Sequence, residues 1–274
     1  MSGSALHPPA TQRSHGRAGL RMGPAGRLRE LWQSGCAKLF LPRGHAPVRE
    51  AVFVNTAGGL TGGDTLRAEV TLEADAALTC TTQAAERIYR SAGGCAQVSA
   101  EFTLGARAAL SWLPQETILF DRSALARRVT VDMAADSELL LLEMLTLGRA
   151  AMGEHAIAAA LEDGREIRRG GRRILHDVQR ATLPLAADRA LLGDATTFAT
   201  LILVAPDAED RIAAARAALA GDGVEAAVSA WDGKLVARLL SPAPERLRRV
   251  AGRGLGLLRR APAPRSWTNG EVAA

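Results

Sequence analysis

Alternating apolar and polar residues run through the middle of the chain. Apolar side chains occupy every second position over 66–72, 98–104 and 129–133, which is the period of a strand with one buried face. Residues 138–146 include four consecutive leucines, as expected for a strand buried on both faces. Because helix signals are few between about 37 and 180, the pattern predicts a mainly β fold with a largely antiparallel or coiled β-sheet body.

The last third of the chain has a different pattern. Asp207 is a candidate N-cap for a helix that runs through alanines and Leu219 and stops near Gly221 or Gly223. Two strand-like runs flank Trp231-Asp232-Gly233, and Asp-Gly between such runs favours a hairpin. The prolines in 241–245 then open a second amphipathic helix. This order predicts a small C-terminal α-β-β-α cap on the β body.

Composition places the chain among ordinary globular proteins. Its 274 residues are 47% hydrophobic and 23% charged. We expect residues 1–15 to form a disordered extension and residues 16–274 to form a single domain. No apolar run is long enough for a membrane span, and the N-terminal segment lacks the apolar core of a secretory signal. The three cysteines have no metal-type spacing, so we expect reduced thiols in a cytoplasmic protein.

The formal net charge is +5, and only two of the 34 basic residues are lysines. Such a balance permits an acidic partner, although the strong preference for arginine is typical of a compositional bias. An aromatic content of 4% and the lack of a binding motif argue against nucleic acid. The second C-terminal helix is basic enough for a membrane surface, but packing on its own sheet is favoured.

A glycine-rich stretch, Asn55–Asp64, lies between two predicted strands. Its glycines are Gly58, Gly59, Gly62 and Gly63. A phosphate-binding P-loop requires Lys-Ser/Thr after the last glycine, and Asp64 stands there instead. The stretch therefore predicts either a wide turn or, because of its carboxylate, a contact with a cation or a basic partner.

Four further stretches, 81–91, 113–122, 143–154 and 264–267, carry polar residues where a plain core would not need them. The first three combine carboxylates with arginines, either as ion pairs at loop ends or as a loose site for a divalent cation. The histidines lack the spacing of a zinc site, and no G-x-S-x-G elbow supports a nucleophile. The residues thus predict no catalytic group.

Taken in order, five segments resemble the motifs of the urease accessory protein D family. They are Asn-Thr-Ala-Gly-Gly-Leu-Thr-Gly-Gly-Asp (55–64), Thr-Thr-Gln-Ala-Ala-Glu-Arg-Ile-Tyr-Arg-Ser (81–91), Leu-Pro-Gln-Glu-Thr-Ile-Leu-Phe-Asp (113–121), Gly-Arg-x-Ala-Met-Gly-Glu (148–154) and Pro-Arg-x-Trp (264–267). Each motif alone is weak, but their order over nearly the whole chain is specific.

This resemblance implies a β-helical body with a few helices near the C-terminus. It also implies a maturation factor that is not an enzyme. Such a factor binds apo-urease together with an F-type accessory protein and a G-type nickel-carrying GTPase. It helps to deliver nickel(II), which would be in transit through an internal polar passage, so we expect no tightly bound cofactor.

The motif residues supply the candidates for the nickel route. Because nickel(II) binds nitrogen and sulfur ligands strongly, scattered carboxylates suit a protein that must release the metal. The carboxylates placed on this route are Asp64, Glu86, Glu116, Asp121, Glu143 and Glu154. The motif residues expected to be structural are Gly58, Gly59, Gly62, Gly63, Arg149 and Trp267. Arg149 could hold Glu143 or Glu154, and His155 is a less favoured relay ligand.

Two other functions stay open at this point. The chain could be a passive module that binds urease or another acidic partner through its arginines, without handling metal. It could also be a hydrolase that uses paired carboxylates as acid and base, which would require two of them in one cleft. Tight nickel binding would argue against the first, and turnover of a small molecule would favour the second.

Overall fold

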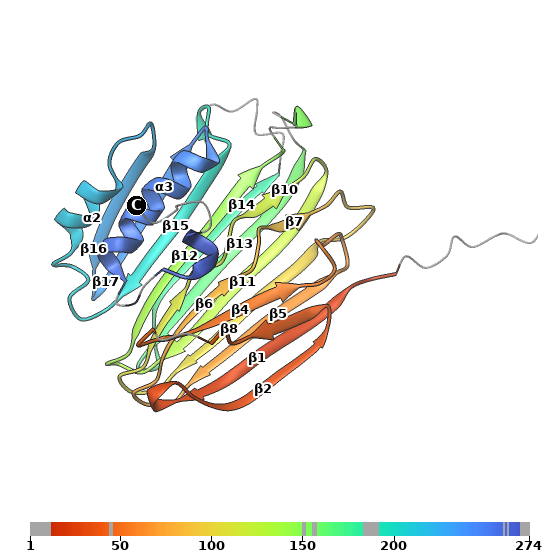
Figure 1. Ribbon diagram of the computed structural model, residues 1–274. Helices are drawn as coiled ribbons and strands as arrows, with labels where there is room; N and C mark the ends of the chain where they lie inside the picture. The colour runs from red at the N-terminus through yellow and green to blue at the C-terminus, as the bar shows by residue number, and fades with distance from the viewer. Residues whose placement is uncertain are drawn as a thin grey trace, which may run out of the picture.

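The computed structural model describes residues 12–43, 46–149, 152–154, 158–182, 192–259, 261 and 263–268, and two β-sheets packed face to face form its body (Figure 1). The first sheet has seven strands in the order β14-β13-β11-β8-β5-β1-β2. Their bounds are β1 His15–Gly23, β2 Arg27–Gly35, β5 Thr65–Leu72, β8 Ala96–Leu104, β11 Ser123–Met133, β13 Ala159–Arg169 and β14 Arg172–Thr182.

The second sheet has ten strands. Eight follow the order β16-β17-β15-β12-β9-β6-β4-β3, the short strand β10 pairs with β12, and the short strand β7 pairs with β10. The bounds are β3 Ala37–Phe40, β4 Arg49–Asn55, β6 Ala77–Thr82, β7 Glu86–Ile88, β9 Ala109–Trp112, β10 Thr117–Leu119, β12 Glu138–Leu147, β15 Thr197–Val204, β16 Glu225–Trp231 and β17 Lys234–Ser241. A 3-10 turn, η1, spans Pro24–Gly26.

Between β4 and β13 the chain alternates between the two sheets, so that each coil places one strand in each. Consecutive strands of one sheet are therefore parallel, and equivalent residues of successive coils stack in register, as Val70, Phe102, Val131 and Ile167 do. This is the β-helical body that the family resemblance implies. The alternative of a largely antiparallel body is wrong, because the antiparallel strand pairs of the described residues lie where the coils begin and end, as β1–β2 and β13–β14 do, and in the C-terminal hairpin region.

The C-terminal elements follow the predicted order, with α2 at Ile212–Leu219 and α3 at Pro244–Leu258 around the β16–β17 hairpin. The hairpin extends the ten-stranded sheet through β15, and α3 packs on β15 and β17 (Figure 1). The first helix begins later than predicted, because the Asp207 carboxylate accepts a hydrogen bond from Arg211 at 2.6 Å instead of capping the helix. A last turn, α4, spans Arg265–Thr268.

Strand β1 begins at His15, inside the segment predicted as an extension, while residues 1–11 lie outside the described residues. Among the helices that the structure describes, none combines the length and apolar character needed to cross a membrane.

Candidate functional site

The glycine-rich stretch forms a loop that packs against the next motif in the chain. Gly59 has φ +158°, and a Cβ at this position would collide with the Tyr89 ring. The Tyr89 hydroxyl donates to the Gly58 carbonyl at 3.0 Å. A Cβ at Gly62 would likewise meet the backbone of Gly93, so these glycines are required for close approach between two loops. Gly63 has φ +89°, the left-handed region that favours glycine.

Asp64 closes this loop. Its two carboxylate oxygens accept hydrogen bonds from the backbone N–H groups of Ser14 and Thr61, each at 2.8 Å. The side chain is only 4% exposed. The carboxylate at the end of the glycine stretch thus ties the loop to the segment before β1, which gives it a structural task in this arrangement.

Between the two sheets lies a cavity of about 180 Å³. Phe53, Trp112 and Val129 contribute apolar wall, and the polar wall includes Glu86, Gln115, Thr117, Arg127 and Glu143. Of the six carboxylates placed on the nickel route, Glu86 and Glu143 line this cavity. The structure therefore brings together two of the six from motifs that lie more than fifty positions apart in the chain.

Glu86 is half-buried and has no guanidinium bonded to it among the described residues. Its carboxylate accepts hydrogen bonds from the Asn55 amide at 3.1 and 3.3 Å. Burial raises the pKa of Glu86 from 4.5 to about 7, and the Asn55 hydrogen bond only partly opposes this shift. Near neutral pH the side chain can therefore exchange a proton.

Glu143 has the opposite environment, because two arginines face it. Arg165 Nε donates to its carboxylate at 2.8 Å, and Arg127 Nε lies 3.7 Å away. Both guanidiniums also bind Asp163, Arg127 through two hydrogen bonds of 2.7 and 2.8 Å and Arg165 at 2.6 Å. These four side chains, each at most 7% exposed, are here called the buried ion cluster.

The arginines control the charge of Asp163. Burial opposes its ionisation, but the charges and hydrogen bonds of Arg127 and Arg165 outweigh burial and lower the pKa of Asp163 to about 2. Asp177 extends the cluster by accepting from Arg165 at 3.2 Å and from Arg238 at 2.6 Å. Arg238 also donates to Thr200, so a continuous set of charged and polar groups crosses from the cavity to β17.

The other three predicted carboxylates lie in loops outside the cavity lining. Glu116 is 3.5 Å from Arg248 of α3, and Asp121 accepts from the Ala158 backbone at 2.9 Å. Glu154 accepts from Arg149 Nε at 3.0 Å and Nη2 at 2.5 Å, which realises one of the two pairings expected for Arg149. His155 lies outside the described residues.

The terminal motif packs against a segment that lines the cavity. Trp267 Nε1 donates to the Leu113 carbonyl at 2.8 Å, and its ring lies 4.5 Å from the Arg248 guanidinium. Arg248 also donates to Gln115 at 2.6 Å. Because Gln115 is part of the cavity wall, Trp267 and Arg248 fix that wall to the C-terminal helices.

No group of three or more His, Cys, Asp or Glu side chains among the described residues is arranged to hold a metal ion. The arrangement is a cavity with one proton-exchanging carboxylate, Glu86, and one carboxylate, Glu143, that is neutralised by arginines.

Sequence reasoning missed Arg127, Asp163, Arg165, Asp177 and Arg238. A signal was present for the first three. Arg127 stands in phase with Leu125 and Val129, and Asp163 and Arg165 stand in phase with Leu161 and Ile167, so charged residues occupy positions that alternation assigns to the interior. No pattern along the chain could show that these strands are neighbours.

Comparison with known proteins agrees with this picture. The family model described as UreD urease accessory protein matches residues 14–268. A protein of Dinoroseobacter shibae named urease accessory protein UreD is 50% identical over 241 residues, covering 88% of this chain and 85% of its own length. Proteins of the same name from Cereibacter sphaeroides and Jannaschia sp. are 47% and 46% identical, and each alignment covers at least 94% of this chain and 97% of the relative. The chain therefore belongs to the UreD family of urease accessory proteins.

Proposed function

We propose that this chain is a urease maturation factor of the cytoplasm. In this role it binds apo-urease together with the F-type and G-type accessory proteins. It helps to deliver nickel(II) to the urease active site and catalyses no reaction of its own. Family membership supports the urease role, and the cavity supports the part that concerns nickel.

The observation that carries the nickel proposal is the pairing of Glu86 and Glu143 in one cavity. The carboxylate, hydroxyl and amide oxygens of its wall would hold nickel(II) less firmly than histidine or cysteine, and the basic side chains that also line it, among them Arg87, Arg127 and Arg128, would weaken the hold further. Glu86 is the better candidate for transient contact, because no arginine of the described residues is bonded to its carboxylate. Asp64, Glu116, Asp121 and Glu154 hold loops in place by the contacts described above.

A proton would leave Glu86 as the metal arrives. The pKa of about 7 means that the carboxyl is partly protonated at neutral pH and holds its proton more firmly than an ordinary carboxyl does, so a nickel ion has to displace that proton. After the metal has moved on, the proton returns. The site is thereby suited to passing a cation along and not to storing it.

The test is co-expression of the tagged chain with the urease subunits and the F-type and G-type proteins of the same organism, followed by pull-down and a urease assay with nickel. We expect apo-urease to be retained by the tagged chain and urease activity to fall when the chain is omitted. Urease activity that does not depend on the chain, with no urease retained, would contradict the proposal.

A passive binding module is distinguished by the nickel content of urease. The cavity variant Glu86→Gln keeps the shape of the side chain and removes its charge. If the chain only binds, urease formed with this variant will contain as much nickel as with the wild type. A fall in nickel with unchanged urease retention supports a part in metal transfer.

A further inference from the structure

Four motif segments meet at one end of the body and build a stack of side chains there. The Tyr89 ring lies on Gly59 and meets Phe120 edge-on, with ring centroids 5.1 Å apart and an interplanar angle of 78°. The Arg149 guanidinium lies 4.2 Å from the Phe120 ring centroid and is bound by Glu154. We call Tyr89, Phe120, Arg149 and Glu154 the aromatic stack. None of these four side chains lines the cavity.

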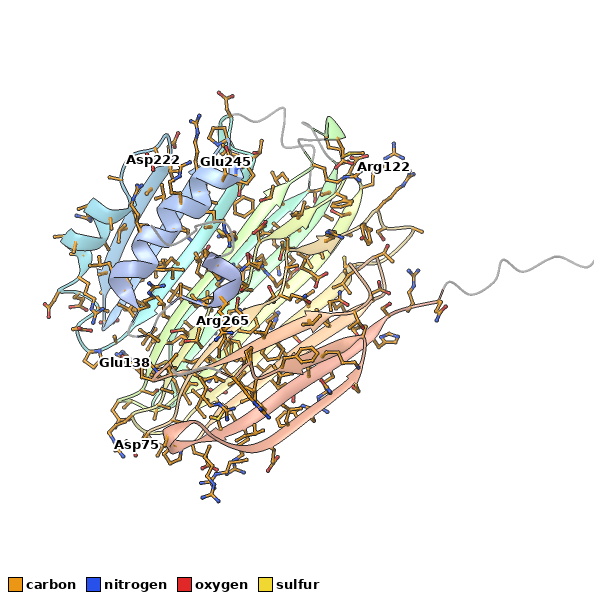
Figure 2. All side chains as sticks on the ribbon, viewed as in Figure 1. Asp75, Arg122, Glu138, Asp222, Glu245 and Arg265 are labelled. Atoms are coloured by element: carbon orange, nitrogen blue, oxygen red, sulfur yellow. The ribbon has the colours of Figure 1, made fainter. Side chains whose placement is uncertain are left out.

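The position of the stack follows from the strands. Arg122 and the stack member Phe120 lie in the loop just before β11, and Figure 2 shows Arg122 at the end of the body opposite Asp75 and Glu138. Arg122 has φ +59°, an uncommon conformation for a residue with a side chain. Backbone hydrogen bonds from Ser91 to Arg122 and from Arg122 to Ala158 hold it in place.

Hydrogen bonds hold the stack in this arrangement. Tyr89 N–H donates to the Leu60 carbonyl at 2.7 Å, in addition to the bond from its hydroxyl to Gly58. Gly148 N–H donates to the Leu119 carbonyl at 2.7 Å, which fixes the Arg149 segment against the Phe120 loop. A preorganised surface loses little conformational entropy on binding, so its contacts contribute more of their energy to affinity.

Its composition is that of a protein interface. Tyr89 is 36% exposed, and Met152, beside Glu154 in the same segment, is 69% exposed. Tyrosine, arginine and methionine are enriched in interface cores, whereas a structural loop end has no need of an exposed methionine or aromatic ring.

The charges around the stack are predominantly positive. Arg87 and Arg90 flank Tyr89 in sequence, are exposed, and form no ion pair with a carboxylate of the described residues. Among the described residues, Arg122 forms an ion pair only with its neighbour Asp121. The Arg122 Nε and the Asp121 carboxylate are 3.6 Å apart, and the carboxylate is partly exposed. This contrasts with Arg149, whose charge is matched by Glu154. Among the described residues, Arg87 and Arg90 are therefore unpaired around an aromatic centre, and Arg122 faces a single, partly exposed carboxylate.

We infer that the aromatic stack with Arg87, Arg90 and Arg122 is the surface on which an acidic face of apo-urease docks. The inference rests on the proposed function for the identity of the partner, and the charge and composition of the surface supply the chemistry. Gly58, Glu86 and Arg87 belong both to this end and to the lining of the cavity. Docking here therefore places the cavity next to the enzyme that receives the metal.

The test measures the affinity of apo-urease for the complete accessory complex carrying Arg87→Glu/Arg90→Glu in this chain. We expect binding to weaken about tenfold or more, because two interface arginines are reversed. The binding of the wild type should also weaken with added salt more steeply than that of the variant. The matched control is Arg172→Glu/Arg173→Glu, an equally exposed pair in the β13–β14 hairpin at the opposite end, which should bind as the wild type does.

A second variant tests the aromatic part without changing charge. Tyr89→Ala removes the exposed ring, and Gly59→Ala displaces it, so both should weaken binding while circular dichroism shows a folded β protein. Wild-type affinity in Arg87→Glu/Arg90→Glu, or equal losses in the control pair, would overturn the inference and leave the proposed function standing. If the wild type itself binds no urease, both fail together.

Discussion

The interior of the body contains two kinds of layer on the same strands. Towards the end where β11 finishes, Val131, Met133 and Ile167 pack in a large apolar core, and towards the other end Leu125 and Leu161 belong to a smaller one. Between them lies the buried ion cluster. Apolar burial contributes about 25 cal/mol per Å², whereas a buried ion pair contributes little net stability because desolvation offsets its attraction. The apolar layers thus account for the fold, and the cluster calls for another explanation.

The largest expected effect comes from breaking the cluster while leaving the apolar layers intact. Asp163→Ala leaves Arg127 and Arg165 with one carboxylate fewer at a buried position. We expect a loss of about 3–5 kcal/mol in the free energy of unfolding, measured by denaturant titration. The neighbouring Glu162→Ala removes an exposed pair with Arg180 and should cost less than about 1 kcal/mol. Equal losses would show that the cluster is no more costly to break than a surface pair.

A smaller effect of opposite sign is expected at Glu86. At pH 8 the Glu86 carboxylate is ionised, and its burial makes the charged form unfavourable in the folded protein. Glu86→Gln removes this unfavourable free energy. Raising the pKa from 4.5 to about 7 corresponds to about 3 kcal/mol at most, so we expect the variant to be about 1–3 kcal/mol more stable at pH 8. Unfolding of both proteins by denaturant at this pH measures the difference. A destabilised variant would mean that the carboxylate is favourably bound and not merely buried.

The same carboxyl makes stability depend on pH. The folded-state pKa lies above the unfolded value, so the favourable contribution of protonated Glu86 is fully present below pH 4.5 and is lost as the pH rises through about 7. The stability gap between Glu86→Gln and the wild type should therefore widen from pH 5 to pH 8. Unfolding titrations at the two pH values check this, and a constant gap would assign the effect to packing.

The smallest effect is expected in the apolar layer. Ile167 is fully buried on β13, two positions beyond Arg165 in the inward phase. Ile167→Val removes one methylene and should cost about 0.5–1.5 kcal/mol in the free energy of unfolding. Because this layer only supports the fold, urease activation by the variant should match that of the wild type. If Ile167→Val loses urease activation while its free energy of unfolding falls only by this small amount, the apolar layer also takes part in function.

How far the sequence predicts this molecule differs between its parts. Alternation in 98–104 and 129–133 located strands, and Asp232-Gly233 located the hairpin, because these signals are local. Val70 stacks on Phe102, and Phe102 stacks on Val131, so each neighbour is one coil away along the chain. No repeat in the sequence marks the length of a coil. The family motifs therefore gave the β-helical arrangement that alternation alone left open.

The candidate site shows the same division. The motifs contain Glu86 and Glu143, the two predicted carboxylates that the cavity brings together, but they also contain Asp64 and Glu154, which bind loops. A motif shows that a residue matters without showing whether it faces a cavity or a backbone N–H. The partners of Glu143 lie on other strands, so only the fold could identify Arg165 as its counter-charge.

The most direct measurement is the nickel content of urease purified after co-expression with the F-type and G-type proteins and either the wild-type chain, Glu86→Gln, or Glu162→Gln on the outer face of the body. We predict that all three chains retain the same amount of urease. Urease formed with Glu86→Gln should contain less nickel and be less active, and urease formed with Glu162→Gln should match the wild type. Full nickel content with Glu86→Gln would contradict the claim that this cavity carries the metal.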